Sequence, residues 1–206
     1  MKVLIAIPCL DMVDTDFMTS MIGLDKPDDC QYMVTKNSMI YDARNNMSWL
    51  AVTKGFEAVL WLDSDMKFKP DLLTQMIGSM NECHGDYLSA LCFTRSIPPT
   101  PVIYKKLEYK PDGNTESEKY FDYPQNQLFK IAGSGLGAVM VSTKLLSEVI
   151  HEFGHPFQPL PYLGEDLSFC HRVQQLGVDM WCDSRIKVGH LGTVNFDEGL
   201  YLDNRR

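Results

Sequence analysis

Two aspartates in the stretch AVLWLDSDMKF (58–68) carry the strongest chemical signal in the sequence. Asp63 and Asp65 follow an apolar run that ends at Leu62. In an extended chain residues i and i+2 point the same way, so both carboxylates are expected to face one spot. Such oxygen pairs suit Mg²⁺ or Mn²⁺, which also bind phosphate oxygens, and the cation would offset the repulsion between the two charges. A solvated turn next to Asp71 is the alternative, because an isolated pair at this spacing also arises by chance.

The order of apolar runs predicts the elements that position this pair. Strand-like runs alternate with helical patterns over the first ~95 residues, which predicts the α/β class with a largely parallel sheet. In open sheets of this class ligands bind beyond the carboxyl ends of the strands, where Asp63 and Asp65 are expected to lie. The predicted strands are 2–9, 31–36, 58–62 and 86–93, and the predicted helices are 43–55, ending at Gly55, and 70–82, with Pro70 in its first turn.

The second half of the chain changes character. Prolines, charges and tyrosines between 97 and 126 predict a long hairpin or surface excursion. Further strands are expected at 128–133, 136–142, 178–183 and 186–190, and helices at 143–153, capped by Thr143, and at 164–177.

Composition limits the classes of function. A chain of 206 residues that is 45% hydrophobic suits one compact domain. Its net charge of −8 repels nucleic acid and anionic lipid, so neither is an expected partner. The N-terminus resembles a first strand, with no signal peptide, and no apolar stretch approaches the ~20 residues of a membrane span. The six cysteines have no zinc-ligand spacing, which favours reduced thiols and a cytoplasmic location.

Two competing motifs fit poorly. A strand ending in Asp-x-Asp is also typical of haloacid-dehalogenase-like phosphatases, in which the first Asp, here Asp63, is the nucleophile. That motif normally lies near the N-terminus and has threonine or valine where this chain has Lys67. The glycines of AGSGLG (132–137) have the wrong spacing for a dinucleotide-binding loop and precede a strand. They are expected instead to let the backbone approach a ligand closely.

Five motifs, taken in order, resemble GT-A glycosyltransferases, in particular the family-2-like and polypeptide N-acetylgalactosaminyltransferase-like groups. The resemblance covers nearly the whole chain. A narrower similarity is to a small viral GT-A domain that glycosylates a capsid protein. The motifs are VLIAIPCLD, YDARNNMSWLAV, AVLWLDSDMKFKPDLL, GSGLGAVMVSTKLL and GEDLSFCHRVQQLGVDMWCDSRIKVGHLG.

This resemblance implies an architecture. The chain would be a single GT-A domain over 1–206, with a Rossmann-like, mixed but mostly parallel sheet flanked by helices and a small antiparallel excursion. Residues 1–95 would form the nucleotide-binding half and 96–206 the acceptor-binding half. The chain is shorter than most members, so it is either a small member or a piece of a longer protein.

The resemblance also implies roles for individual residues. Asp65 would bind Mn²⁺ or Mg²⁺ directly, Asp63 would bind the ribose or the metal through water, and His190 would be a further metal ligand. Glu165 and Asp166 would face the acceptor, with Asp166 as general base in an inverting enzyme. The structural alternatives are a core histidine and a charged helix N-terminus. Further donor-binding residues would be Pro8, Cys9, Leu10, Asp11, Arg44, Ser64, Gly133 and Gly135.

The predicted function is therefore metal-dependent transfer of a sugar from a nucleotide-diphosphate sugar, with uridine diphosphate (UDP) favoured, to a hydroxyl of a glycan or glycoprotein. The similarity of the 164–190 region to retaining members favours retention of configuration. If the protein is viral, the location would be the host cytoplasm. A phosphatase using Asp63 and a non-catalytic nucleotide-sugar-binding module are the alternatives. Specificity is expected to depend on residues 94–126 and on the loop from Gly192.

Overall fold

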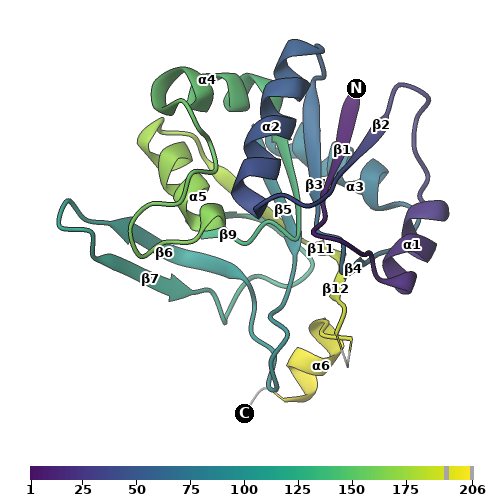
Figure 1. Ribbon diagram of the computed structural model, residues 1–206. Coiled ribbons are helices and arrows are strands. Elements are labelled where there is room, and N and C mark those ends of the chain that lie inside the picture. Colours follow the sequence, from purple (N-terminus) through teal and green to yellow (C-terminus); the bar gives the residue numbers. More distant parts are fainter. Residues whose placement is uncertain (193–194, 205–206) are drawn as a thin grey trace.

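A seven-stranded sheet forms the centre of the computed structural model, which describes residues 1–192 and 195–204 (Figure 1). Its strand order is β2-β1-β3-β10-β5-β11-β8. Residues 193–194, within the predicted specificity loop, lie outside the described residues. The strands are β1 (Val3–Pro8), β2 (Gln31–Thr35), β3 (Ala58–Leu62), β5 (Tyr87–Leu91), β8 (Leu128–Ile131), β10 (Ala138–Ser142) and β11 (Met180–Lys187).

The pairing directions make this sheet mixed but mostly parallel, as predicted. β1 pairs in parallel with β2 and β3, and β11 pairs in parallel with β5. β10 runs antiparallel between β3 and β5, and β8 closes the far edge antiparallel to β11. Strands from both halves of the sequence therefore share one sheet, and the carboxyl ends of β1, β3 and β5 lie at the same edge.

Helices cover both faces of the sheet (Figure 1). Successive residues of β1 point to opposite faces, so Leu4 and Ala6 join one buried cluster while Val3 and Ile5 join the other. The first cluster is covered by α2 (Ile40–Thr53), α4 (Thr143–Phe153) and α5 (Glu165–Gln175); the second is covered by α1 (Thr15–Ile22) and α3 (Leu72–Cys83). Burial on both faces explains why the sequences of β1 and β3 are continuously apolar.

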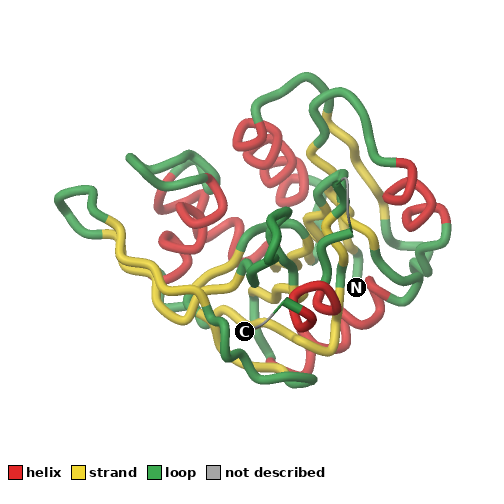
Figure 2. Tube along the Cα trace, turned by 90° about the horizontal axis from the view of Figure 1, so that it is seen from below, coloured by secondary structure: helices red, strands yellow, loops and turns green. Residues whose placement is uncertain are grey.

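The predicted excursion at 97–126 is a hairpin. β6 (Ile103–Tyr109) pairs with β7 (Thr115–Lys119) and, on its other side, with the two-residue strand β9 (Gly133–Ser134). The hairpin extends away from the body of the molecule at the left of Figures 1 and 2. The short strands β4 (Met66–Lys67) and β12 (Gly189–His190) also pair, with His190 opposite Met66. This last pairing brings the late histidine to the chain just after Asp65.

Several predicted boundaries and caps were wrong. The cap of α4 is Ser142, whose hydroxyl accepts the Leu145 N–H at 3.0 Å. The Thr143 hydroxyl donates instead to the Phe56 carbonyl at 2.5 Å. The predicted helix from Pro70 begins at Leu72, and Asp71 is its N-cap residue without a capping hydrogen bond from its side chain. β11 continues through 184–185, where the sequence predicted a break, and neither α1 nor α6 (Glu198–Asp203) was predicted.

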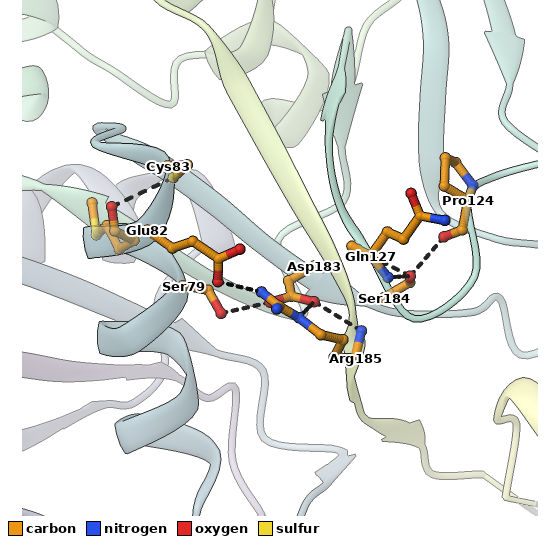
Figure 3. Close-up of polar contacts among 9 residues, drawn as sticks. Ser79, Glu82, Cys83, Pro124, Gln127, Asp183, Ser184 and Arg185 are labelled. Atoms are coloured by element: carbon orange, nitrogen blue, oxygen red, sulfur yellow. Dashed lines mark hydrogen bonds and ion pairs between the residues drawn. The ribbon is translucent and has the colours of Figure 1, made fainter.

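A polar network ties α3 to β11 (Figure 3). The fully buried carboxylate of Asp183 accepts the Ser79 hydroxyl at 2.5 Å and the Arg185 Nη2 at 2.7 Å. Arg185 also reaches Glu82 on α3 at 2.7 Å. The neighbouring Ser184 hydroxyl donates to the Pro124 carbonyl at 2.6 Å, so adjacent residues of β11 anchor a helix and the end of the excursion.

Within the described residues, no helix combines the length and the apolar character needed to cross a lipid bilayer.

Candidate functional site

A cleft of about 400 Å³ opens at the carboxyl ends of β1 and β3. Seven of the predicted site residues line it: Pro8, Cys9, Leu10, Asp63, Ser64, Asp65 and His190. Four residues that the sequence did not single out complete the lining: Ser38, Met39, Ile40 and Arg95. Asp11, Arg44, Gly133, Gly135, Glu165 and Asp166 were also predicted as site residues but are not part of this lining.

The two aspartates lie on a tight turn. The Met66 N–H donates to the Asp63 carbonyl at 3.2 Å, which closes the turn over Ser64 and Asp65. The Asp63 N–H is held by the Gly137 carbonyl at 3.0 Å. The expected extended conformation was therefore wrong, although both side chains do line the same cleft.

Asp63 faces a buried arginine. Its Oδ1 accepts from Arg44 Nη2 at 2.7 Å, and the Arg44 side chain is 1% exposed. Arg44 Nε lies 3.9 Å from Glu165 Oε1, and the guanidinium packs 5.5 Å from the Trp61 ring. Arg44 thus lies beneath the cleft and joins the end of β3 to the start of α5. The predicted contact of Arg44 with the base or diphosphate remains untested.

Asp65 faces a histidine and a second arginine. Its Oδ2 lies 3.3 Å from His190 Nε2 and 2.9 Å from Arg95 Nη1. The other ring nitrogen of His190, Nδ1, lies 2.9 Å from the Phe93 carbonyl and donates to it, which fixes the ring orientation. The Leu191 N–H donates to the Asp65 carbonyl at 2.7 Å, so the backbones are also joined.

Mutual attraction shifts the pKa of both groups. Burial raises the pKa of Asp65, but the hydrogen bond from His190 and the charges of His190 and Arg95 outweigh it and lower the pKa overall. Burial lowers the pKa of His190, and its hydrogen bonds to Asp65 and Phe93 outweigh that effect and raise it. The pair therefore favours charged forms of both side chains when no other ligand is bound.

The donor set at Asp65 fits a divalent cation in part. Asp65 Oδ1 is buried and has no hydrogen-bond partner among the described residues, which leaves a carboxylate oxygen available as a ligand. His190 Nε2 is next to the same carboxylate. Over 1–192 and 195–204 no group of three His, Cys, Asp or Glu side chains is close enough to hold a metal. Two of the three predicted ligands meet, while the third, Asp63, contacts Arg44.

Glu165 and Asp166 form the first turn of α5. Asp166 Oδ1 accepts the N–H of Leu167 at 2.7 Å, so the structural role of charging a helix N-terminus is realised here. Burial, followed by the charge of Glu165, raises the pKa of Asp166 from 3.8 to about 6. A carboxyl group with this pKa is suited to accept a proton near neutral pH.

Gly133 and Gly135 are buried and pack against protein rather than lining the cleft. A Cβ at Gly135 would lie 2.7 Å from Val102 Cγ1 and 3.6 Å from Asp166 Oδ2. A Cβ at Gly133 would lie 3.1 Å from Leu107 Cδ2 and 3.2 Å from Cys170 Cβ. These distances show close packing of β9 and Gly135 beside α5, and the expected close approach of both glycines to the donor stays a prediction.

The residues missed from the sequence follow a recognisable rule. Arg95 lies four residues after β5 ends. Ser38 and Met39 directly precede α2, and Ile40 is its first residue, so these residues flank the same sheet edge as Asp65. A parallel sheet gathers such segments at one edge. The position of Arg95 could be predicted only from the strand order of the sheet, because the sequence around Arg95 contains no recognisable motif.

Comparison with solved structures identifies the fold. A197 from STIV superposes with a TM-score of 0.68 at 15% identity, over 93% of this chain and 86% of that chain. GalNAc-T7 with UDP, GalNAc and Mn²⁺ superposes with a TM-score of 0.64 at 9% identity, over 93% of this chain and 43% of that chain. At these identities the likeness establishes the fold, and the predicted GT-A fold is confirmed. No protein-family model and no curated protein match the sequence.

Proposed function

We propose that the chain is a metal-dependent glycosyltransferase that uses a nucleotide-diphosphate sugar, with UDP as the leaving group. The observation that carries the proposal is the Asp65–His190 pair, with its partnerless carboxylate oxygen, inside a cleft at the carboxyl edge of the sheet. The same fold in GalNAc-T7, whose structure contains UDP and Mn²⁺, supports it.

Each part of the cleft has a role in this proposal. Asp65 and His190 would hold Mn²⁺ or Mg²⁺, which when bound stabilises the negative charge that develops on the departing diphosphate. Leu10, Met39 and Ile40 offer an apolar wall for the nucleobase. Asp63, oriented by Arg44, is available to the ribose.

The acceptor would be a hydroxyl of a glycan or glycoprotein and would approach from the α5 side. Asp166 would then orient that hydroxyl, or take its proton if configuration is inverted. We favour retention, which needs no such base, because the 164–190 region resembles retaining members. The anomeric configuration of the first product, measured by NMR, distinguishes the two. The six free thiols support a reducing, cytoplasmic compartment.

Calorimetric titration with UDP in the presence of Mn²⁺ tests the proposal. Wild type should bind UDP, and both chelation of the metal and Asp65→Ala should weaken binding by at least about tenfold, since each removes the anchor of the diphosphate. Asp28→Ala is the matched control, because it removes an exposed carboxylate before β2, at the amino end of the sheet. UDP binding that is indifferent to chelator and to Asp65→Ala would contradict the proposal.

The phosphatase alternative makes a different prediction. It requires Asp63 as a free nucleophile, whereas Asp63 Oδ1 is bound by the buried Arg44 at 2.7 Å. Hydrolysis of p-nitrophenyl phosphate that is abolished by Asp63→Asn would favour it. A non-catalytic module would bind the donor without turnover.

A further inference from the structure

Among the residues that the structure describes, Arg95 is the one lysine or arginine that lines the cleft. It lies on the connection between β5 and β6, whose base is closed by the Thr94 N–H donating to the Thr100 carbonyl at 2.9 Å and by a bridge between Phe93 and Pro101. Its side chain is 53% exposed. The connection is thus anchored, while the guanidinium at its rim is largely in solvent.

The contact between Arg95 and Asp65 competes with a bound cation. Arg95 Nη1 lies 2.9 Å from Asp65 Oδ2, the same oxygen that faces His190 Nε2. A divalent ion on this carboxylate would repel the guanidinium at such short range. Arg95 has no other ion pair among the described residues, so it is free to leave Asp65.

The proposed donor needs a cation that the rest of the cleft does not supply. A diphosphate is strongly anionic, and the chain has a net charge of −8. Arg44 is 1% exposed and already bound to Asp63, so it does not present its fork to the cleft. A guanidinium offers a fixed set of N–H donors that matches phosphate oxygens.

We infer that Arg95 is an exchangeable cation, paired with Asp65 in the free protein and transferred to the donor's diphosphate when a divalent ion occupies Asp65. This rests on the proposed function and adds a binding residue to it. No covalent bond changes: the guanidinium exchanges a carboxylate acceptor for phosphate oxygens. Arg95 would then add a second positive charge, beside that of the divalent ion, to stabilise the leaving group.

The inference predicts effects of opposite sign in one variant. Arg95→Ala should bind Mn²⁺ alone several-fold more tightly, because the competing cation is gone. In saturating Mn²⁺ it should bind UDP about tenfold more weakly, because charge-assisted hydrogen bonds to the diphosphate are lost. Arg95→Lys keeps the positive charge but loses the planar set of guanidinium N–H donors. Its affinity for UDP should therefore lie between those of Arg95→Ala and wild type.

Calorimetry with Mn²⁺ alone, and then with UDP in saturating Mn²⁺, measures both effects. Lys67→Ala is the control for general electrostatics, because it removes a positive charge near the cleft that pairs with Asp16 rather than Asp65. Unchanged UDP affinity in Arg95→Ala, or weaker binding of Mn²⁺, would overturn the inference while leaving the proposed function intact. A wild type that binds neither ligand would overturn both. Thermal unfolding of each variant confirms that it is folded.

Discussion

At the scale of single residues, the half-buried carboxyl of Asp166 links stability to pH. Its pKa is about 6 in the folded protein against 3.8 ordinarily, so between these values the folded chain binds the extra proton. The stabilising contribution is therefore complete below about pH 4 and is lost as the pH rises through about 6.

Asp166→Asn removes this dependence. We expect its gain in unfolding free energy over wild type to be larger at pH 7.5 than at pH 5 by roughly 1 kcal/mol. Urea denaturation at the two pH values measures it. Asp28→Asn, at an exposed position, should show no such difference. If the unfolding free energy that Asp166→Asn gains over wild type became smaller as the pH rose, the raised pKa of Asp166 would be refuted.

Two arginines of the site should differ in their importance for folding. Arg44 is buried and lies beside both Asp63 and Glu165, whereas Arg95 pairs with Asp65 at the surface. Arg44→Leu leaves two partly buried carboxylates without their cation and should cost on the order of 3 kcal/mol of unfolding free energy. Arg95→Ala should cost less than about 1 kcal/mol. Denaturation curves showing equal losses would contradict this ranking.

At the scale of elements, β11 depends on a side-chain clamp to α3. Ser79 donates to the buried Asp183 carboxylate at 2.5 Å. Ser79→Ala removes one hydrogen bond to that buried carboxylate, while Arg185 still donates to the same oxygen, and should cost about 1 kcal/mol of unfolding free energy. Chemical denaturation measures the loss, and Ser96→Ala, in the exposed connection after β5, is the control. A loss no greater than that of the control would show that the clamp does not stabilise the protein.

The strands and long helices were predictable because burial on two faces leaves continuous apolar runs. Short elements were not. α1 buries only Phe17, and β4, β9 and β12 have two residues each, so none of them leaves a periodic pattern. Yet the β4–β12 pairing is what brings His190 to Asp65. The resemblance predicted that His190 lies near Asp65. The strand pairing that places it there was visible only in the structure.

The glycines show a second limit of sequence reasoning. A glycine marks a place where backbone comes close to something, and the sequence does not say to what. At Gly135 the neighbour is Val102 of the excursion, a residue that no sequence motif connects with this glycine. The contact of these glycines with the donor therefore stays a prediction, while their contacts with protein are visible in the structure.

At the scale of the whole molecule, one sheet edge collects the site. Segments around residues 8–10, 38–40, 63–65, 95 and 190 meet there although they span most of the chain. The sheet is covered by helices on both faces, so this edge is where polar side chains can gather without disturbing the core (Figure 1). An acidic chain can admit a polyanionic donor at this edge only with local cations, which is why the divalent ion and Arg95 are central to the account.

The central claim is that Asp65 and His190 share a divalent cation. A crystal of the protein grown with UDP and Mn²⁺, recorded at a wavelength where manganese scatters anomalously, tests it most directly. The account predicts an anomalous peak within about 2.5 Å of both Asp65 and His190 Nε2, with the diphosphate on its open side. A diphosphate bound in the cleft with no such peak, or a peak away from these two side chains, would contradict it.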